Sequence, residues 1–259
     1  MNAVNDENFL EVQGIAMSFG GLMALSNLDF QVKRGMIKGI IGPNGAGKTT
    51  LFNIITGSFP PTNGTIRFKG RSIENLKAHK IADRGISRTF QTIELFGNMT
   101  VLENIMLGCH TRFRPSFVAS GFKFPQSGRK ERQILDSGMK ILKFIGLSEK
   151  FNDLAENLPL GEQKMVEIGR ALASEPELIC LDEPAAGLNE TETYLASSLI
   201  RAINAKGITI LLVEHDMRVI MNISDEIVVI NYGQKIAEGS PEEIQNNPRV
   251  IEAYLGSEA

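Results

Sequence analysis

Eight residues, Gly42-Pro-Asn-Gly-Ala-Gly-Lys-Thr49, constrain the fold of this chain more than any other stretch. They match the pattern Gly-x-x-x-x-Gly-Lys-Thr and stand between an apolar run, "MIKGII", and a segment of helical character, "TLFNIITG". Such glycines let backbone N–H groups converge on phosphate oxygens, and the following helix turns its positive end to the same anion. The pattern predicts a nucleotide phosphate site at a strand-to-helix turn. Its expected members are Gly42, Pro43, Asn44, Gly45, Ala46, Gly47, Lys48, Thr49 and Thr50.

A second acidic motif complements this loop. In "LICLDEP", an apolar strand delivers Asp182 and Glu183 to its carboxyl end, where open α/β sheets bind their ligands. We expect Lys48 to reach the β- and γ-phosphates, Thr49 and Asp182 to hold Mg²⁺, and Glu183 to polarise the attacking water. Two acids at a strand end can also be simple helix caps, but beside a phosphate loop the hydrolytic interpretation is favoured.

Three further residues are candidates for the same site. His215 follows the strand "ITILLVE", so it could reach the edge of the γ-phosphate, although a lone histidine is usually a surface or core residue. Gln91 ends "SRTFQ" at the start of a helical region, where it could touch metal and water. Phe19 in "MSFGG" could stack on adenine, and core packing is the equal alternative.

The overall composition excludes several classes of protein. Lys and Arg total 27 against 30 Asp and Glu, so the net charge of −3 gives no general attraction to nucleic acid. Two cysteines, Cys109 and Cys180, form no disulfide framework, and Cys180 is expected in the core. The N-terminal stretch lacks the apolar segment of a signal peptide, and no apolar run approaches the roughly 20 residues of a membrane span.

The order of elements predicts an α/β protein. Alternating stretches before about residue 35 indicate antiparallel strands, and strands alternating with helices after Leu160 indicate a mainly parallel sheet covered on both faces. The region between is mostly helical, with a capping box at Thr100 and Glu103. We therefore predict one domain. Its expected parts are a core with an antiparallel β subdomain (1–91 and 165–240), a helical subdomain (92–164) and a helical tail (241–259).

Together these motifs resemble the ATP-binding subunits of ABC transporters, over essentially the whole chain. Gly42–Thr49 is similar to their Walker A loop, Asp182 and Glu183 to Walker B and the catalytic glutamate, and "AAGLN" (185–189) to the D-loop. The resemblance gives three more residues a role in the family: Gln91 as the Q-loop glutamine, His215 as the switch histidine and Phe19 as the adenine-stacking aromatic. Stretches such as "GISRTFQ", "LDEPAAGLN" and "NNPRVIEAYLG" resemble the subfamily that imports branched-chain and related hydrophobic amino acids.

The resemblance implies a P-loop ATPase that uses ATP and Mg²⁺ at the cytoplasmic face of a membrane. It implies partners as well: a second ATPase subunit in a head-to-tail dimer, two permease subunits and, indirectly, a solute-binding protein. "LPLGEQ" (158–163) falls where the family has the signature Leu-Ser-Gly-Gly-Gln, so Leu160, Gly161 and Glu162 would cap ATP held by the partner. Alternative functions are an ABC system for urea, amides or lipid, a non-transport ABC protein, or another P-loop enzyme such as a nucleotide kinase.

This sequence departs from the family pattern at the signature. Pro159 replaces the serine hydroxyl and has no backbone N–H, and Leu160 replaces a glycine. A weaker cap predicts that the ATPase partner is a different chain with a stronger signature. Asn189 replaces the usual D-loop aspartate and could simply cap the following helix together with Glu192.

Two surfaces are candidates for other contacts. Thr92–Leu107 is expected to help line the groove for a permease helix through Leu95, Phe96 and Met99, with core packing as the alternative. The stretch 110–132 is expected to form an insertion in which basic residues alternate with phenylalanines. A solvated loop is its commonest meaning, while a nucleic-acid contact or a surface beside anionic lipid would also fit this composition.

Overall fold

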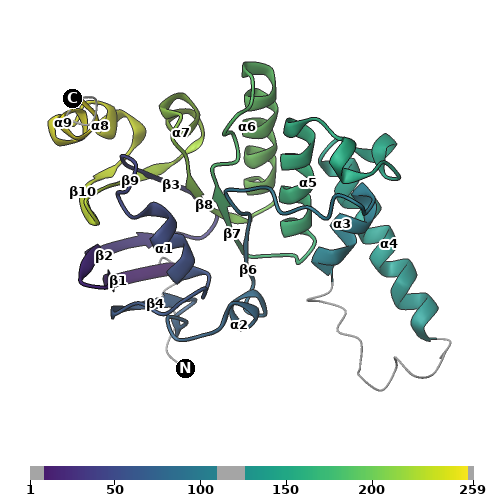
Figure 1. Ribbon diagram of the computed structural model, residues 1–259, viewed down its shortest axis with the longest axis horizontal. Coiled ribbons are helices and arrows are strands. Elements are labelled where there is room, and N and C mark those ends of the chain that lie inside the picture. Colours follow the sequence, from purple (N-terminus) through teal and green to yellow (C-terminus); the bar gives the residue numbers. More distant parts are fainter. Residues whose placement is uncertain (1–8, 110–125, 256–259) are drawn as a thin grey trace.

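The computed structural model describes residues 9–109 and 126–255, and it contains two sheets flanked by helices (Figure 1). The smaller sheet is antiparallel, in the order β2-β1-β4-β5. Its strands are β1 (Leu10–Phe19), β2 (Leu22–Val32), β4 (Asn63–Phe68) and β5 (Arg71–Ser72). The antiparallel strands predicted near the N-terminus are confirmed, and β5 is an addition to them.

The larger sheet carries the phosphate loop. Its six strands run in the order β10-β9-β3-β8-β7-β6, and all neighbours are parallel except β10, which pairs antiparallel with β9. The strands are β3 (Ile37–Ile41), β6 (Ile86–Arg88), β7 (Leu178–Asp182), β8 (Thr209–Val213), β9 (Glu226–Asn231) and β10 (Gln234–Gly239). The mainly parallel sheet is confirmed, and β10 was not predicted.

The core divides between the two faces of this sheet. Side chains alternate along each strand, so Ile40 and Cys180 join one buried cluster while Ile41 and Leu181 join the other. The antiparallel sheet and α1 (Lys48–Ile55) cover the first face. Helix α2 (Ala78–Ala82) adds Ile81 to the first cluster, and the helices from α3 (Val101–Gly108) onward cover the second face, which accounts for the nearly uninterrupted apolar strands. Cys180 is fully buried, as predicted, and burial raises the pKa of its thiol to about 12.

Helix starts follow the predicted capping chemistry. Capping boxes open α3 (Val101–Gly108), α6 (Glu190–Asn204) and α8 (Pro241–Gln245). The boxes pair Thr100 with Glu103, Asn189 with Glu192, and Ser240 with Glu243. In each, the cap side chain accepts a bond from a backbone N–H that the helix leaves free. The capping interpretation of Asn189 is therefore confirmed.

The other helices are α2 (Ala78–Ala82), α4 (Gln126–Phe144), α5 (Leu160–Leu172), α7 (Met217–Ile223) and α9 (Pro248–Leu255), with short turns η2 (Ser148–Lys150) and η3 (Ala155–Asn157). Helices α3, α4 and α5 pack together at one end of the molecule, and α8 and α9 lie at the other (Figure 1). Residues 126–132, part of the stretch expected to form an insertion, begin α4. Residues 110–125 lie outside the described part of the chain.

Candidate functional site

The phosphate loop forms the predicted turn between β3 and α1. Gly47 caps α1 at φ 106°, and a Cβ there would lie 2.7 Å from the Ala24 carbonyl oxygen, so only glycine fits. A Cβ on Gly42 would lie 2.0 Å from the Ile230 carbonyl oxygen. These close approaches fix the loop against β2 and β9.

Lys48 is buried at the start of α1. Its ammonium donates to the carbonyls of Gly42 at 2.6 Å and Pro43 at 3.0 Å. Burial lowers the pKa of Lys48, while the charges of Glu183 and Asp182 act in the opposite direction. The lysine is thus held within its own loop, close to both acidic residues.

Asp182 ends β7 with an almost completely buried carboxylate. Its Oδ2 accepts a hydrogen bond from Arg88 at 2.8 Å, and its Oδ1 has no hydrogen-bond partner. Burial raises the pKa of this carboxyl, and Arg88 opposes that effect. An unpartnered, buried carboxylate oxygen is suited to bind Mg²⁺. This ion prefers oxygen donors, and it uses few protein carboxylates when phosphate is present. No cluster of three or more His, Cys, Asp or Glu side chains suited to a metal occurs within the described ranges.

Glu183 lies between two of the predicted residues. His215 Nε2 lies 2.7 Å from its Oε1, and Gln91 Nε2 donates to its Oε2 at 3.2 Å. Its backbone has φ 51°, a left-handed conformation that a glutamate rarely adopts, and its carbonyl accepts from Lys164 at 2.7 Å. Two segments far apart in sequence therefore converge on this carboxylate, and a third holds the backbone behind it.

The remaining predicted residues lie on surrounding elements. Phe19, at the end of β1, is 46% exposed and packs edge-on against Phe59, so core packing does not describe it. Leu160 is exposed at the first position of α5, and Glu162 is tied to Lys150 at 2.6 Å. Helices α1 and α5 lie well apart in Figure 1.

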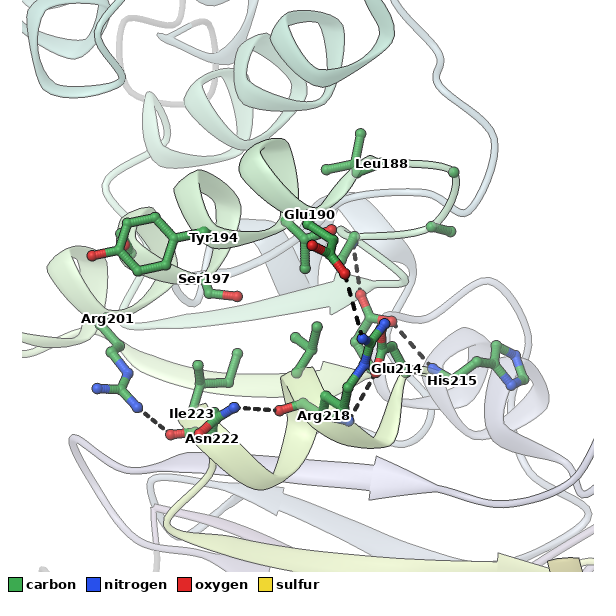
Figure 2. A pocket seen from close by; sticks show the side chains of 17 residues that line it. Leu188, Glu190, Tyr194, Ser197, Arg201, Glu214, His215, Arg218, Asn222 and Ile223 are labelled. Carbon is green, nitrogen blue, oxygen red and sulfur yellow. Dashed lines mark hydrogen bonds and ion pairs between the residues drawn. The ribbon is translucent and has the colours of Figure 1, made fainter.

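A pocket of about 780 Å³ opens beside this site, between α6 and α7 (Figure 2). His215 and the loop 185–188 border it, but Lys48 and Asp182 are not among its lining residues. Glu214 connects His215 to the loop 185–188, since its carboxylate accepts hydrogen bonds from the backbone N–H groups of Ala185 at 2.7 Å and His215 at 3.1 Å. The pocket therefore shares His215 with the site, but Lys48, Asp182 and Glu183 do not line it.

Sequence reasoning missed Arg88, Lys164 and Glu214. Their only sequence signal is a charged residue within or beside an apolar element, which does not identify a partner. Each bonds a residue distant in the chain, and Arg88 and Asp182 are separated by 94 positions.

Comparison with known proteins agrees with this geometry. The ABC transporter family model matches residues 25–186, and the model described as branched-chain amino acid ATP-binding cassette transporter matches residues 234–259. The chain is 45% identical to the high-affinity branched-chain amino acid transport ATP-binding protein BraF of Pseudomonas aeruginosa, over 95% of this chain and 97% of that protein. The corresponding protein LivG of Escherichia coli K12 is also 45% identical, with the same shares covered.

Solved structures agree on the fold. An ATP-binding cassette of an ABC transporter in its ADP conformation superposes with a TM-score of 0.83 at 34% identity, covering 96% of this chain and 99% of that one. A dimeric cassette in a post-hydrolysis state, bound to ADP and Pi, superposes with a TM-score of 0.76 at 25% identity, covering 90% and 98%.

The chain thus belongs to the ABC transporter family, as one of its ATP-binding cassettes, and it is an ATPase. Within that class its relatives and its C-terminal match are those of branched-chain amino acid transport.

Proposed function

We propose that this chain hydrolyses ATP to drive an importer of branched-chain or related amino acids. The observation that carries the ATPase chemistry is the Glu183 carboxylate, held between Gln91 and His215 and close to Lys48. The transported class rests on the relatives, whose names specify branched-chain amino acid transport, and on the match at residues 234–259.

The phosphates bind in the loop Gly42–Thr50 at the positive end of α1. On binding, the Lys48 ammonium exchanges the Gly42 and Pro43 carbonyls for β- and γ-phosphate oxygens. Phe19 offers its exposed ring to the adenine. Thr49, Gln91 and Asp182 would hold Mg²⁺, which neutralises charge on the phosphate oxygens.

Glu183 orients the attacking water. Each carboxylate oxygen keeps a lone pair free beside its bond to Gln91 or His215, so it can accept a hydrogen bond from water. The water oxygen bonds to the γ-phosphorus, the bond to the β-γ bridging oxygen breaks, and ADP and inorganic phosphate result. The water proton passes first to Glu183, and His215 holds that carboxylate in place.

The second half of each ATP site comes from a partner cassette. Helix α5 begins at Leu160 without a side-chain cap, so the N–H groups of its first turn are available to an anion. Glu162 is paired with Lys150, which reduces its repulsion toward phosphate. We infer that Leu160, Gly161 and Glu162 cap ATP on a second, different ATPase subunit.

The helical unit, residues 92–164, would meet a permease subunit at the cytoplasmic face of a membrane, in an assembly that contains two permeases. Phe96 is 53% exposed, whereas Leu95 packs against the core. Buried Asn104 bonds both the N–H and the carbonyl of Phe96, at 2.9 and 3.1 Å, which fixes the backbone that carries the exposed ring. Within the described ranges no helix has the length and hydrophobicity needed to cross a bilayer.

Reconstitution tests the proposed function. The chain is co-expressed with the permeases and second ATPase that co-purify with it, and proteoliposomes are assayed for ATP-dependent uptake of leucine, urea and lipid, with the cognate solute-binding protein added. We expect leucine uptake. Phe96→Glu should abolish that uptake while the isolated chain still binds ATP as the wild type does. Transport of urea or lipid without transport of leucine would contradict the amino-acid assignment.

A further inference from the structure

Arg88 is a buried cation at the end of β6, with its side chain 8% exposed. Its guanidinium donates to Asp182 Oδ2 at 2.8 Å. The same group donates to Asn53 Oδ1 at 2.6 Å and Thr56 Oγ1 at 3.2 Å. One side chain therefore bonds β7 and the far end of α1 together.

These bonds connect the three elements that carry the proposed metal ligands. Helix α1 carries Thr49 in its first turn, β7 ends at Asp182, and the chain leaving β6 reaches Gln91 three residues after Arg88. Arg88 thus fixes the spacing of elements whose side chains must meet one ion.

The geometry also fixes the orientation of the carboxylate. Arg88 occupies Oδ2 of Asp182 and leaves Oδ1 buried without a hydrogen-bond partner. The guanidinium itself lies over two aromatic rings, with the ring centroid of Phe52 at 5.7 Å and that of Phe90 at 5.2 Å. Neither group can rotate freely, so Oδ1 is the oxygen presented to a ligand.

We propose that Arg88 is a positioning residue for the magnesium site, acting through Asp182 and through the link to α1. The inference rests on the proposed function, which places Mg²⁺ on Asp182. Partners of metal ligands typically contribute ten- to a hundredfold to metal affinity. If Arg88 only neutralised the charge of Asp182, lysine could replace it. A positioning role requires the guanidinium, because only its forked N–H groups reach all three acceptors.

The test measures metal binding directly. Mn²⁺ replaces Mg²⁺, and its binding to the full chain with ADP is followed by electron paramagnetic resonance for the wild type, Arg88→Lys and Arg88→Gln. We expect both variants to need at least tenfold more Mn²⁺ for half-saturation. ADP binding in EDTA, followed with a fluorescent analogue, should stay within twofold of the wild type. Arg67→Gln, an exposed arginine on β4, is the matched control and should change neither quantity.

Asn53→Ala keeps the Arg88–Asp182 pair and removes one bond to α1, so a few-fold loss of Mn²⁺ affinity is expected even if Arg88→Gln fails to fold. If Arg88→Lys and Asn53→Ala bind Mn²⁺ with wild-type affinity while Asp182→Asn loses binding, the positioning role of Arg88 is wrong but the metal site stands. Wild-type affinity in Asp182→Asn would overturn the metal site itself, and this inference with it.

Discussion

At the scale of single residues, Glu183 shows how the site is held ready. A non-glycine residue in the left-handed region costs on the order of 1–3 kcal/mol and persists only where its surroundings fix it. Lys164 fixes its backbone carbonyl, and Gln91 and His215 fix its carboxylate. The left-handed backbone turns the carboxylate toward Gln91 and His215. A regular continuation of β7 would not do so.

Lys38 provides a prediction on pH at the same scale. It is fully buried in β3, and its ammonium pairs with Glu226 and Glu238. Burial alone would raise the pKa of Glu238, but bonds from Lys235 and Lys38 outweigh burial and lower it below its ordinary value of 4.5. A lowered folded-state pKa stabilises the fold above pH about 4.5, and this contribution disappears as pH falls through the folded value.

We therefore expect Glu238→Gln to be less stable than the wild type at pH 7, by about 1 kcal/mol, the upper end for an exposed pair, because Lys38 is buried and Glu238 only partly exposed. The difference should shrink between pH 5 and pH 3. Urea unfolding at pH 7, 5, 4 and 3 measures it, with exposed Glu252→Gln as the control. A difference that stays constant down to pH 3 would show that the pair does not stabilise the fold.

Residue chemistry was predictable where it lies in a local motif. Gly42–Thr49 and the pair Asp182-Glu183 can be recognised from neighbouring residues in the sequence. The structure also brings Gln91, Glu183 and His215 together. Arg88 could not be assigned, since its role depends on three partners that folding brings to it.

At the scale of elements, α5 links the two proposed halves of the machinery. Its side chains at three-residue spacing bond the catalytic segments: Lys164 reaches the Glu183 carbonyl, and Glu167 accepts the Phe90 N–H at 3.0 Å. Arg170 donates to the Glu94 carbonyl at 2.6 Å. Helices after Leu160 were predicted, but the partners of this polar face were not.

The hairpin of β9 and β10 explains one missed strand. Tyr232 and Gly233 form its two-residue turn with φ of 46° and 75°. Tyrosine is an unusual residue for such a turn, where Asn-Gly or Asp-Gly is the ordinary signal. The strand "QKIAEG" is also largely exposed, so no hydrophobic alternation marks it.

Helix α9 gives a prediction at this scale. The backbone N–H of Gly42, the first residue of the phosphate loop, hydrogen-bonds the Tyr254 phenol. Burial raises the pKa of that phenol to about 12, with the Gly42 bond opposing, so the hydroxyl stays protonated at every pH where the protein is assayed. Tyr254→Phe keeps the ring and loses this bond, worth about 0.5–1.5 kcal/mol.

We expect Tyr254→Phe to weaken ATP binding by about two- to tenfold at unchanged pH dependence up to pH 10. Titration with a fluorescent ATP analogue measures this, and Tyr194→Phe on exposed α6 is the control. Equal affinity in wild type and Tyr254→Phe would mean that α9 does not support the loop.

At the scale of the whole molecule, the uncapped start of α5 predicts an asymmetric assembly. Pro159 offers the partner's ATP neither a hydroxyl nor an N–H. With a second subunit of stronger signature, the ATP bound on this chain should be hydrolysed faster than the ATP bound on the partner. Glu183→Gln should then reduce steady-state ATPase of the complex more than the matching change in the partner.

The same asymmetry predicts that Pro159→Ser raises hydrolysis at the partner's site, since a hydrogen bond to charged phosphate is worth about 1.5–3 kcal/mol. Equal losses from the two glutamate variants would contradict it. A fully active homodimer of this chain alone would contradict it as well.

The central claim is that Glu183 acts on water while Lys48 binds phosphate. The decisive measurement compares Glu183→Gln with Lys48→Ala in the same complex, by ATP binding in the presence of Mg²⁺ and by single-turnover hydrolysis. We predict that Glu183→Gln binds ATP within about twofold of the wild type and hydrolyses it at least a hundredfold more slowly, as expected when a water-orienting base is lost. Lys48→Ala should lose ATP affinity by roughly tenfold or more. Hydrolysis by Glu183→Gln near the wild-type rate would contradict the account.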